Sequence, residues 1–202
     1  MISNTQAFML LFLMLGPFKI LGPFVHITKN ADPSLSRKLA LNAILFSIIA
    51  LVLAAFLGEN ILKNYGIPVP ILALSAGIIL FLVALLGILT QFISTEKPEV
   101  NPGPPTMAEA LHPLTFPTIV TPYGIAAVIV LIALRTELND KLIIVAIVVG
   151  IMVLNLVVML FAKSVFKTLA VVLALLGAIL GVIQVALGAN IIYNSFKALL
   201  AS

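Results

Sequence analysis

The chain has 202 residues, of which 62% are hydrophobic and only 9% are charged. A soluble domain needs far more polar surface to cover its core, so this composition excludes a water-soluble fold and predicts a chain largely surrounded by lipid. The net charge is +4, and the basic residues lie between apolar runs, which indicates contact with lipid headgroups. We therefore expect no nucleic-acid partner.

Apolar stretches of about 20 residues, the length that crosses a bilayer as a helix, follow one another along the chain. We expect six spans, at Thr5–Thr28, Leu39–Leu57, Val69–Ile93, Leu111–Leu134, Leu142–Ala162 and Leu169–Phe196. The prediction is an all-α, multi-pass bundle in the cell membrane, with one transmembrane domain over residues 1–202.

Lysine and arginine are distributed unequally between the two sides of this predicted bundle. The connections after the first, third and fifth spans contain Lys29, Arg37, Lys38, Lys97, Lys163 and Lys167. The other side contains Lys63, Arg135, Lys141 and Lys197. Because cytoplasmic loops are enriched in positive charge, we expect both termini to lie outside.

A proline-rich segment divides the chain nearly in half. We expect a first repeat at residues 1–95, a linker at residues 96–107 and a second repeat at residues 108–202. Paired prolines lie inside the first span of each half: Pro17 and Pro23, then Pro117 and Pro122. Because each half has an odd number of spans, the second half would enter the membrane upside down, as in the inverted repeats of many transporters.

The paired prolines and nearby glycines should break the first and fourth spans, as kinks or as re-entrant loops. Freed amides suit a carboxylate and freed carbonyls suit an ammonium or a cation, so a zwitterionic amino acid would satisfy both. The predicted binding residues are Gly16, Pro17, Gly22, Pro23, Thr118, Thr121, Pro122 and Gly124. The alternative is that both breaks are proline kinks satisfied by neighbouring helices.

Other polar residues in the spans allow two interpretations each. Lys19 is the only charge in the first break, and it either neutralises a substrate carboxylate or a lipid phosphate, or extends to the membrane interface. Asn155 and Gln184 either bond to neighbouring helices or face a cavity. No acidic residue lies deep in a span, which leaves the coupling to a cation gradient unexplained.

Catalytic motifs are missing from the sequence. It contains no His-Glu-x-x-His, no Gly-x-Ser-x-Gly and no phosphate-binding loop, and it has no cysteine. We therefore expect no enzymatic activity, no cofactor and no metal site.

The proline-bearing segments resemble the MarC family, which includes SnatA-like neutral amino acid transporters. The resemblance rests on the stretch from Pro113 to Gly124, Pro-Leu-Thr-Phe-Pro-Thr-Ile-Val-Thr-Pro-Tyr-Gly, and on Gly-Pro-Phe-Lys from Gly16. It implies six spans in the inner membrane and transport of small neutral amino acids driven by a cation gradient of protons or sodium. Many members carry Asp-Pro-x-Gly-Asn-x-Pro in the first span, whereas this chain has Gly16 in place of the aspartate and Lys19 near the Gly-Asn pair.

The sequence thus favours a secondary transporter that works by alternating access. An exporter or channel for another small solute or drug is an alternative. A non-transporting membrane scaffold is another, since Gly177, Gly181 and Gly188 form a small-residue stripe suited to packing within the bundle or between subunits of an oligomer.

Overall fold

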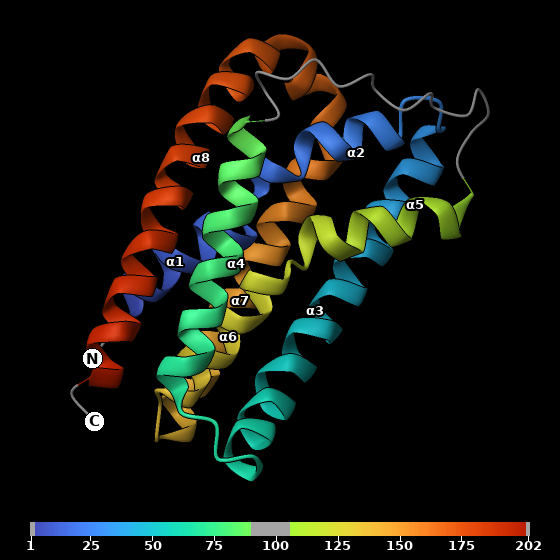
Figure 1. The fold of residues 1–202 in the computed structure, drawn as a ribbon. Coiled ribbons are helices and arrows are strands. Elements are labelled where there is room, and N and C mark those ends of the chain that lie inside the picture. The colour runs from blue at the N-terminus through green and yellow to red at the C-terminus, as the bar shows by residue number, and fades with distance from the viewer. Residues whose placement is uncertain (1–2, 90–105, 201–202) are drawn as a thin grey trace.

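The computed structural model describes the backbone of residues 3–89 and 106–200 and, outside residues 109–110 and 163–174, their side chains. Helices make up nearly all of these two ranges, which contain no strand. In chain order they are α1 (Asn4–Leu15), the 3-10 turn η1 (Pro17–Lys19), α2 (Leu21–Ile27), α3 (Pro33–Asn64), α4 (Val69–Leu89), α5 (Met107–Pro113), the π-helical turn η2 (Leu114–Ile119), α6 (Pro122–Ala133), α7 (Leu138–Leu160) and α8 (Ala162–Leu200) (Figure 1).

Five segments of the described chain are long and apolar enough to cross a membrane as helices. These are Asn4–Ile27, Pro33–Asn64, Val69–Leu89, Leu138–Leu160 and Leu175–Leu200. The segments Leu111–Ile119 and Pro122–Ala133 qualify only together, as a pair bent by 52°. The predicted all-helical bundle is confirmed, with five spans or with six if the bent pair is one span.

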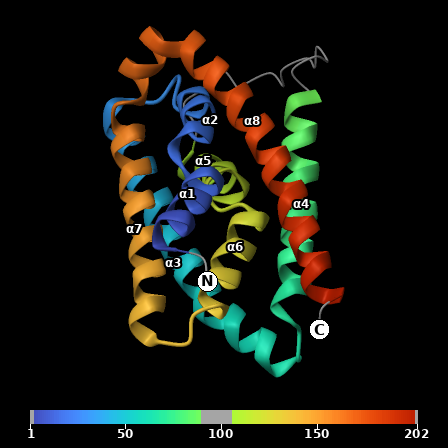
Figure 2. The ribbon, with the colours of Figure 1, turned by 90° about the vertical axis from the view of Figure 1, so that its left-hand side faces the viewer.

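The helices form a bundle in which the two broken segments occupy the middle. Figure 2 shows α4 and α8 on one side, α3 and α7 on the other, and α1, α2, α5 and α6 between them. The N- and C-terminal ends lie at the same end of the bundle in Figure 1, which is called the terminal end below. The most extensive helix contact joins α4 to α8, and α3 contacts both α6 and α7.

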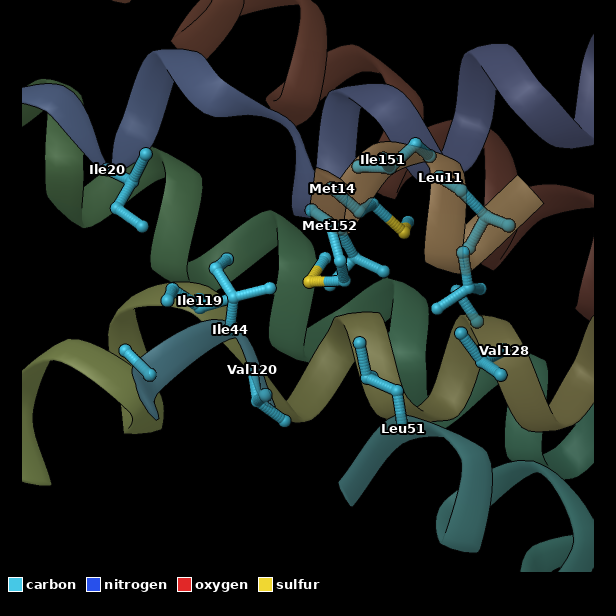
Figure 3. Packing of buried hydrophobic residues seen from close by; sticks show 14 of the residues in the cluster. Leu11, Met14, Ile20, Ile44, Leu51, Ile119, Val120, Val128, Ile151 and Met152 are labelled. Carbon is cyan, nitrogen blue, oxygen red and sulfur yellow. The ribbon is translucent and has the colours of Figure 1, made fainter. Parts of the chain in front are cut away.

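One continuous apolar core joins the elements. It draws side chains from α1, α3, α6 and α7, which point toward one another in Figure 3. The labelled members are Leu11, Met14, Ile20, Ile44, Leu51, Ile119, Val120, Val128, Ile151 and Met152. The outward faces are also apolar, with exposed leucine, isoleucine and phenylalanine along α3, α4, α7 and α8. Such a surface is stable where lipid surrounds it.

The helix boundaries differ from the expected ones at several points. The helix α3 begins at Pro33 and ends at Asn64, beyond both ends of the expected apolar stretch, because polar residues continue the helix past the apolar part. Residues 90–105, with the end of the expected third span and most of the proline-rich linker, lie outside the described residues.

Candidate functional site between the two broken spans

The first break separates α1 from η1 at Gly16 and Pro17. The last backbone hydrogen bond of α1 runs from Gly16 N to Phe12 O at 2.9 Å. Pro17 has no N–H to continue the pattern, and the chain turns into the 3-10 geometry of η1. The carbonyl oxygens of residues 13–15 are therefore left without partners in α1, at the negative end of its dipole.

Three side chains from three different elements donate hydrogen bonds to these carbonyls. They are Gln184 Nε2 of α8 to Leu13 O at 2.7 Å, Lys19 Nζ of η1 to Met14 O, and Asn155 Nδ2 of α7 to Leu15 O at 2.8 Å. Each consecutive carbonyl thus has one donor. The broken helix end is fully capped by side chains that the rest of the fold supplies.

The second break lies between η2 and α6. The backbone is extended at Phe116 (φ −134°, ψ 130°), at Val120 and at Thr121. Helix α6 then starts with Pro122 in its first turn, and Thr121 Oγ1 accepts a hydrogen bond from Gly124 N at 3.1 Å. Thr121 is therefore the N-cap of α6, at the positive end of that helix.

The two breaks are in direct contact. Lys19 Nζ donates a hydrogen bond to Tyr123 Oη at 2.7 Å, across 104 positions of sequence, and lies 4.7 Å from the centre of the tyrosine ring. Gly124 makes the approach possible, because a Cβ atom there would lie 2.5 Å from Leu15 Cδ2. The negative end of α1 and the positive end of α6 therefore meet around one lysine.

Asn155 also carries a polar atom that has no protein partner. Its side chain is only 1% exposed, and its Nδ2 donates to Leu15 O, so its Oδ1 must point the other way. This Oδ1 is buried without a hydrogen bond. Buried polar atoms without a partner are uncommon and costly, so this acceptor is a candidate to bind a hydrogen-bond donor.

The structure brings together most of the residues predicted to form the site. Those at or beside the contact between the breaks are Gly16, Pro17, Lys19, Thr121, Pro122, Gly124, Asn155 and Gln184. The side chains of Asn155 and Gln184 donate hydrogen bonds to α1, which agrees with the interpretation that they bond to neighbouring helices. The amine of Lys19 lies at the break, in contact with Met14 O and Tyr123 Oη.

Three other predicted residues lie apart from this contact. Gly22 has no atom within 4 Å of where its Cβ would be, so no other part of the described chain packs against it there. Pro23 is exposed on α2. The hydroxyl of Thr118 donates to Pro113 O at 2.6 Å inside its own segment, which satisfies it locally.

Tyr123 is the residue that sequence reasoning missed. It is buried, with 4% of its surface exposed. Its signal was present, because a tyrosine inside an apolar span has a hydroxyl that needs a partner. The partner is a residue of the other half of the chain, which no local pattern reveals.

A cavity reaches the first break from the terminal end. Its volume is about 380 Å³, and it is lined by the second half of α1, the first residues of α4 and the C-terminal halves of α6 and α8. Met14, whose carbonyl binds Lys19, lines it at one end. Its walls are mostly apolar, and the polar groups come from α8: Asn190, Asn194 and Ser195.

Comparison with known proteins identifies the family of this chain. The family model for MarC family integral membrane proteins matches residues 2–200. The chain belongs to the MarC family. Its resemblance to that family is thereby confirmed, and this chain is an integral membrane protein.

Curated relatives of this MarC family chain are membrane proteins whose names state no activity. It is 26% identical over 140 residues to the UPF0056 membrane protein MJ1677 of Methanocaldococcus jannaschii, covering 69% of this chain and 68% of that protein. It is 27% identical over 127 residues to the UPF0056 inner membrane protein YhgN of Escherichia coli K12, covering 62% of each. It is 31% identical over 88 residues to a UPF0056 membrane protein of Buchnera aphidicola subsp. Baizongia pistaciae, covering 44% of each.

These matches thus span about two thirds or less of the relatives' own lengths. No solved structure matches this chain.

Proposed function

We propose that this protein is a secondary transporter of small neutral amino acids, such as glycine and alanine, across the cytoplasmic membrane. The observation that carries the proposal is the contact between the two broken spans, where Lys19 of the first bonds to Tyr123 of the second. Broken helices that meet inside a bundle are the usual substrate site of secondary transporters, because irregular backbone at membrane depth is tolerated only where protein or a cavity covers it. The resemblance to SnatA-like transporters points to the same substrate class.

The pattern of helix contacts supports two inverted repeats. The first span of the N-terminal half contacts the second span of the other half, α1 against α7. The reciprocal contact also exists, α6 against α3. The two third spans, α4 and α8, pack on each other. A pseudo-twofold axis in the membrane plane would produce such an exchange, and alternating access in such folds is largely the rocking of one part against another.

Two groups at the first break suit the two charges of an amino acid. An ammonium has three N–H donors, and Lys19 directs two of them to Met14 O and Tyr123 Oη. The remaining donor suits a substrate carboxylate. The Oδ1 of Asn155, buried and without a partner, suits the substrate ammonium, since Asn155 and Lys19 bind adjacent carbonyls of α1.

The cavity at the terminal end supports an access route on that side. It ends at Met14 beside the break, while the unpaired Oδ1 of Asn155 is enclosed in this conformation. A substrate would reach that oxygen only when helices move, which is the behaviour that alternating access requires. The enclosed position also favours a small side chain on the substrate.

Uptake by purified protein in liposomes tests the proposal. We expect saturable uptake of radiolabelled alanine or glycine, lowered about tenfold or more by Asn155→Leu because the substrate ammonium loses an acceptor. Lys38→Ala, at an exposed position on α3, is the matched control and should transport normally. Folded protein that takes up no neutral amino acid, and whose melting temperature no amino acid raises, would contradict the proposal.

An exporter or channel for a less polar small solute is the second candidate. The mostly apolar walls of the cavity favour it. Competition separates the two candidates: excess unlabelled glycine should abolish alanine uptake by an amino acid transporter, whereas an apolar solute carrier should be inhibited only by apolar compounds.

A further inference from the structure

The three consecutive carbonyls at the end of α1 each accept a hydrogen bond from a different side chain, and Lys19 takes one of them together with the hydroxyl of Tyr123. Two of them accept hydrogen bonds from the neutral amides of Gln184 and Asn155. The middle one, of Met14, accepts from the ammonium of Lys19. Lys19 Nζ also donates to Tyr123 Oη at 2.7 Å and lies 4.7 Å from the centre of the tyrosine ring.

The two oxygens that bind Lys19 Nζ, Met14 O and Tyr123 Oη, are also suitable ligands for a free monovalent cation. Freed carbonyls and the C-terminal ends of half-helices are the groups that hold coupling cations in broken-helix transporters. The partial negative charge of a helix C-terminus and the face of an aromatic ring both stabilise positive charge. The ammonium of Lys19 therefore already provides the positive charge that these groups stabilise.

No carboxylate in the described part of the chain is paired with the amine of Lys19. Among the described residues, the buried carboxylate is Glu59, whose oxygens lie 2.7 and 2.8 Å from Lys141 Nζ. Lys63 also pairs with it at 2.7 Å. This cluster joins α3 to α7 at the terminal end, where it is already neutralised. A metal cation added next to Lys19 would be repelled without a carboxylate to offset the repulsion.

We propose that Lys19 is a tethered cation, occupying the monovalent-cation site at the end of α1, so that substrate binding and transport require neither sodium nor potassium. The part of this inference that concerns transport rests on the proposed function. The cation site itself does not, because it is defined by the contacts of Lys19. Removing the side chain at position 19 should expose the site to a free ammonium or alkali cation.

Thermal unfolding of the detergent-purified full-length chain tests the site without any transport. Wild-type protein should melt at the same temperature in equal concentrations of sodium, potassium and choline chloride. Lys19→Ala should melt about 5 °C lower. Added n-propylammonium chloride, which replaces the missing end of the side chain, should restore much of this loss, and choline, which is too bulky, should not. Lys38→Ala is the control that should respond to none of these salts.

Three results in this assay would overturn the proposal. One is a Lys19→Ala protein as stable as wild type, and another is a loss of stability that neither n-propylammonium nor sodium restores. The third is a selective rise of the wild-type melting temperature with sodium, which needs no variant and therefore stays decisive if Lys19→Ala does not fold. Lys19→Met, which fills most of the space without the charge, should also lose stability, and n-propylammonium should not restore it because the methionine side chain occupies the place of the added amine.

Uptake measurements then separate this inference from the proposed function. Alanine uptake by wild-type protein that is equal in sodium-free and sodium-containing buffers supports a tethered cation, and uptake that requires sodium overturns it while the transporter proposal stands. Absence of uptake together with n-propylammonium rescue of Lys19→Ala contradicts the transporter proposal and supports the cation site.

Discussion

At the scale of single residues, the site depends on atoms that are missing as much as on those that are present. Pro17 lacks the N–H that would have extended α1, which frees carbonyls for side chains from other helices. Gly124 lacks the Cβ that would have collided with Leu15. The same type of residue at Gly22 has open space around it, so glycine by itself does not mark a close approach.

Gly124→Ala should therefore destabilise the protein by about 1–3 kcal/mol, since the added methyl would lie 2.5 Å from Leu15 Cδ2 and 2.8 Å from Thr121 Oγ1. Gly22→Ala is the matched control and should be neutral or slightly stabilising, because alanine favours helix over glycine. Unfolding of both purified variants in increasing SDS measures the difference. Equal stability of the two would show that α1 and α6 do not approach as described.

Asn155→Leu should cost about 1–3 kcal/mol, because it removes the donor to Leu15 O and leaves that carbonyl unpaired in an apolar interior. Asn139→Leu lies on the same helix at an exposed position and should change stability by less than about 0.5 kcal/mol. The same SDS titration compares the two variants. A similar loss in both would mean that the capping of α1 contributes nothing measurable.

At the scale of helices, α4 and α8 pack most closely because glycines lie between them. A Cβ on Gly188 would lie 2.8 Å from the backbone nitrogen of Phe81, and one on Gly77 would lie 2.9 Å from Ile191 Cγ2. Gly181 also approaches α4, at Ile88, whereas Gly177 has no neighbour within 4 Å. The small-residue stripe therefore serves packing inside the bundle at two of its three positions.

Gly188→Ala should destabilise the protein by about 1–3 kcal/mol, because the backbone of α4 cannot move aside as a flexible side chain would. Gly177→Ala, on the same helix with open space around it, is the control and should be nearly neutral. Melting temperatures of the two purified variants give the comparison. If Gly177→Ala were the more damaging change, the stripe would serve an interface outside this bundle.

At the scale of the whole molecule, both chain ends lie at one end of the bundle, together with an ionic cluster. Glu59 binds Lys141 there, and Arg135 donates to Asn4 Oδ1 at 3.2 Å, which connects the start of α1 to the connection before α7. These contacts tie the terminal end together on both sides of the cavity. The opposite end is the side richer in lysine and arginine, and basic side chains there, such as Lys29 and Lys38, are exposed.

Single cysteines can establish the topology, since the chain has none of its own. Ser3→Cys and Glu137→Cys should react together with a membrane-impermeant maleimide added to intact cells, and Asn30→Cys should react only after permeabilisation. This pattern follows from the position of Ser3 and Glu137 at the terminal end and from the excess of lysine and arginine on the other side. The reverse labelling pattern would place both termini in the cytoplasm.

The sequence alone determined the class of solvent, the approximate spans and the positions of both breaks. These features are local: apolar length decides what enters a bilayer, and proline interrupts a helix wherever it falls. It also named Lys19, Asn155 and Gln184, because polar groups in an apolar span must find partners.

The identity of those partners depends on the tertiary structure. Lys19 meets Tyr123 across 104 positions of sequence, and Gln184 meets Leu13 across 171, because the bundle brings the ends of α1 and α6 together in its middle. The same packing separates Gly124, which is in close contact, from Gly22, which is not. Hydrogen-bond partners and close approaches are properties of three-dimensional neighbours, and neighbours so distant in the chain leave no local pattern to read.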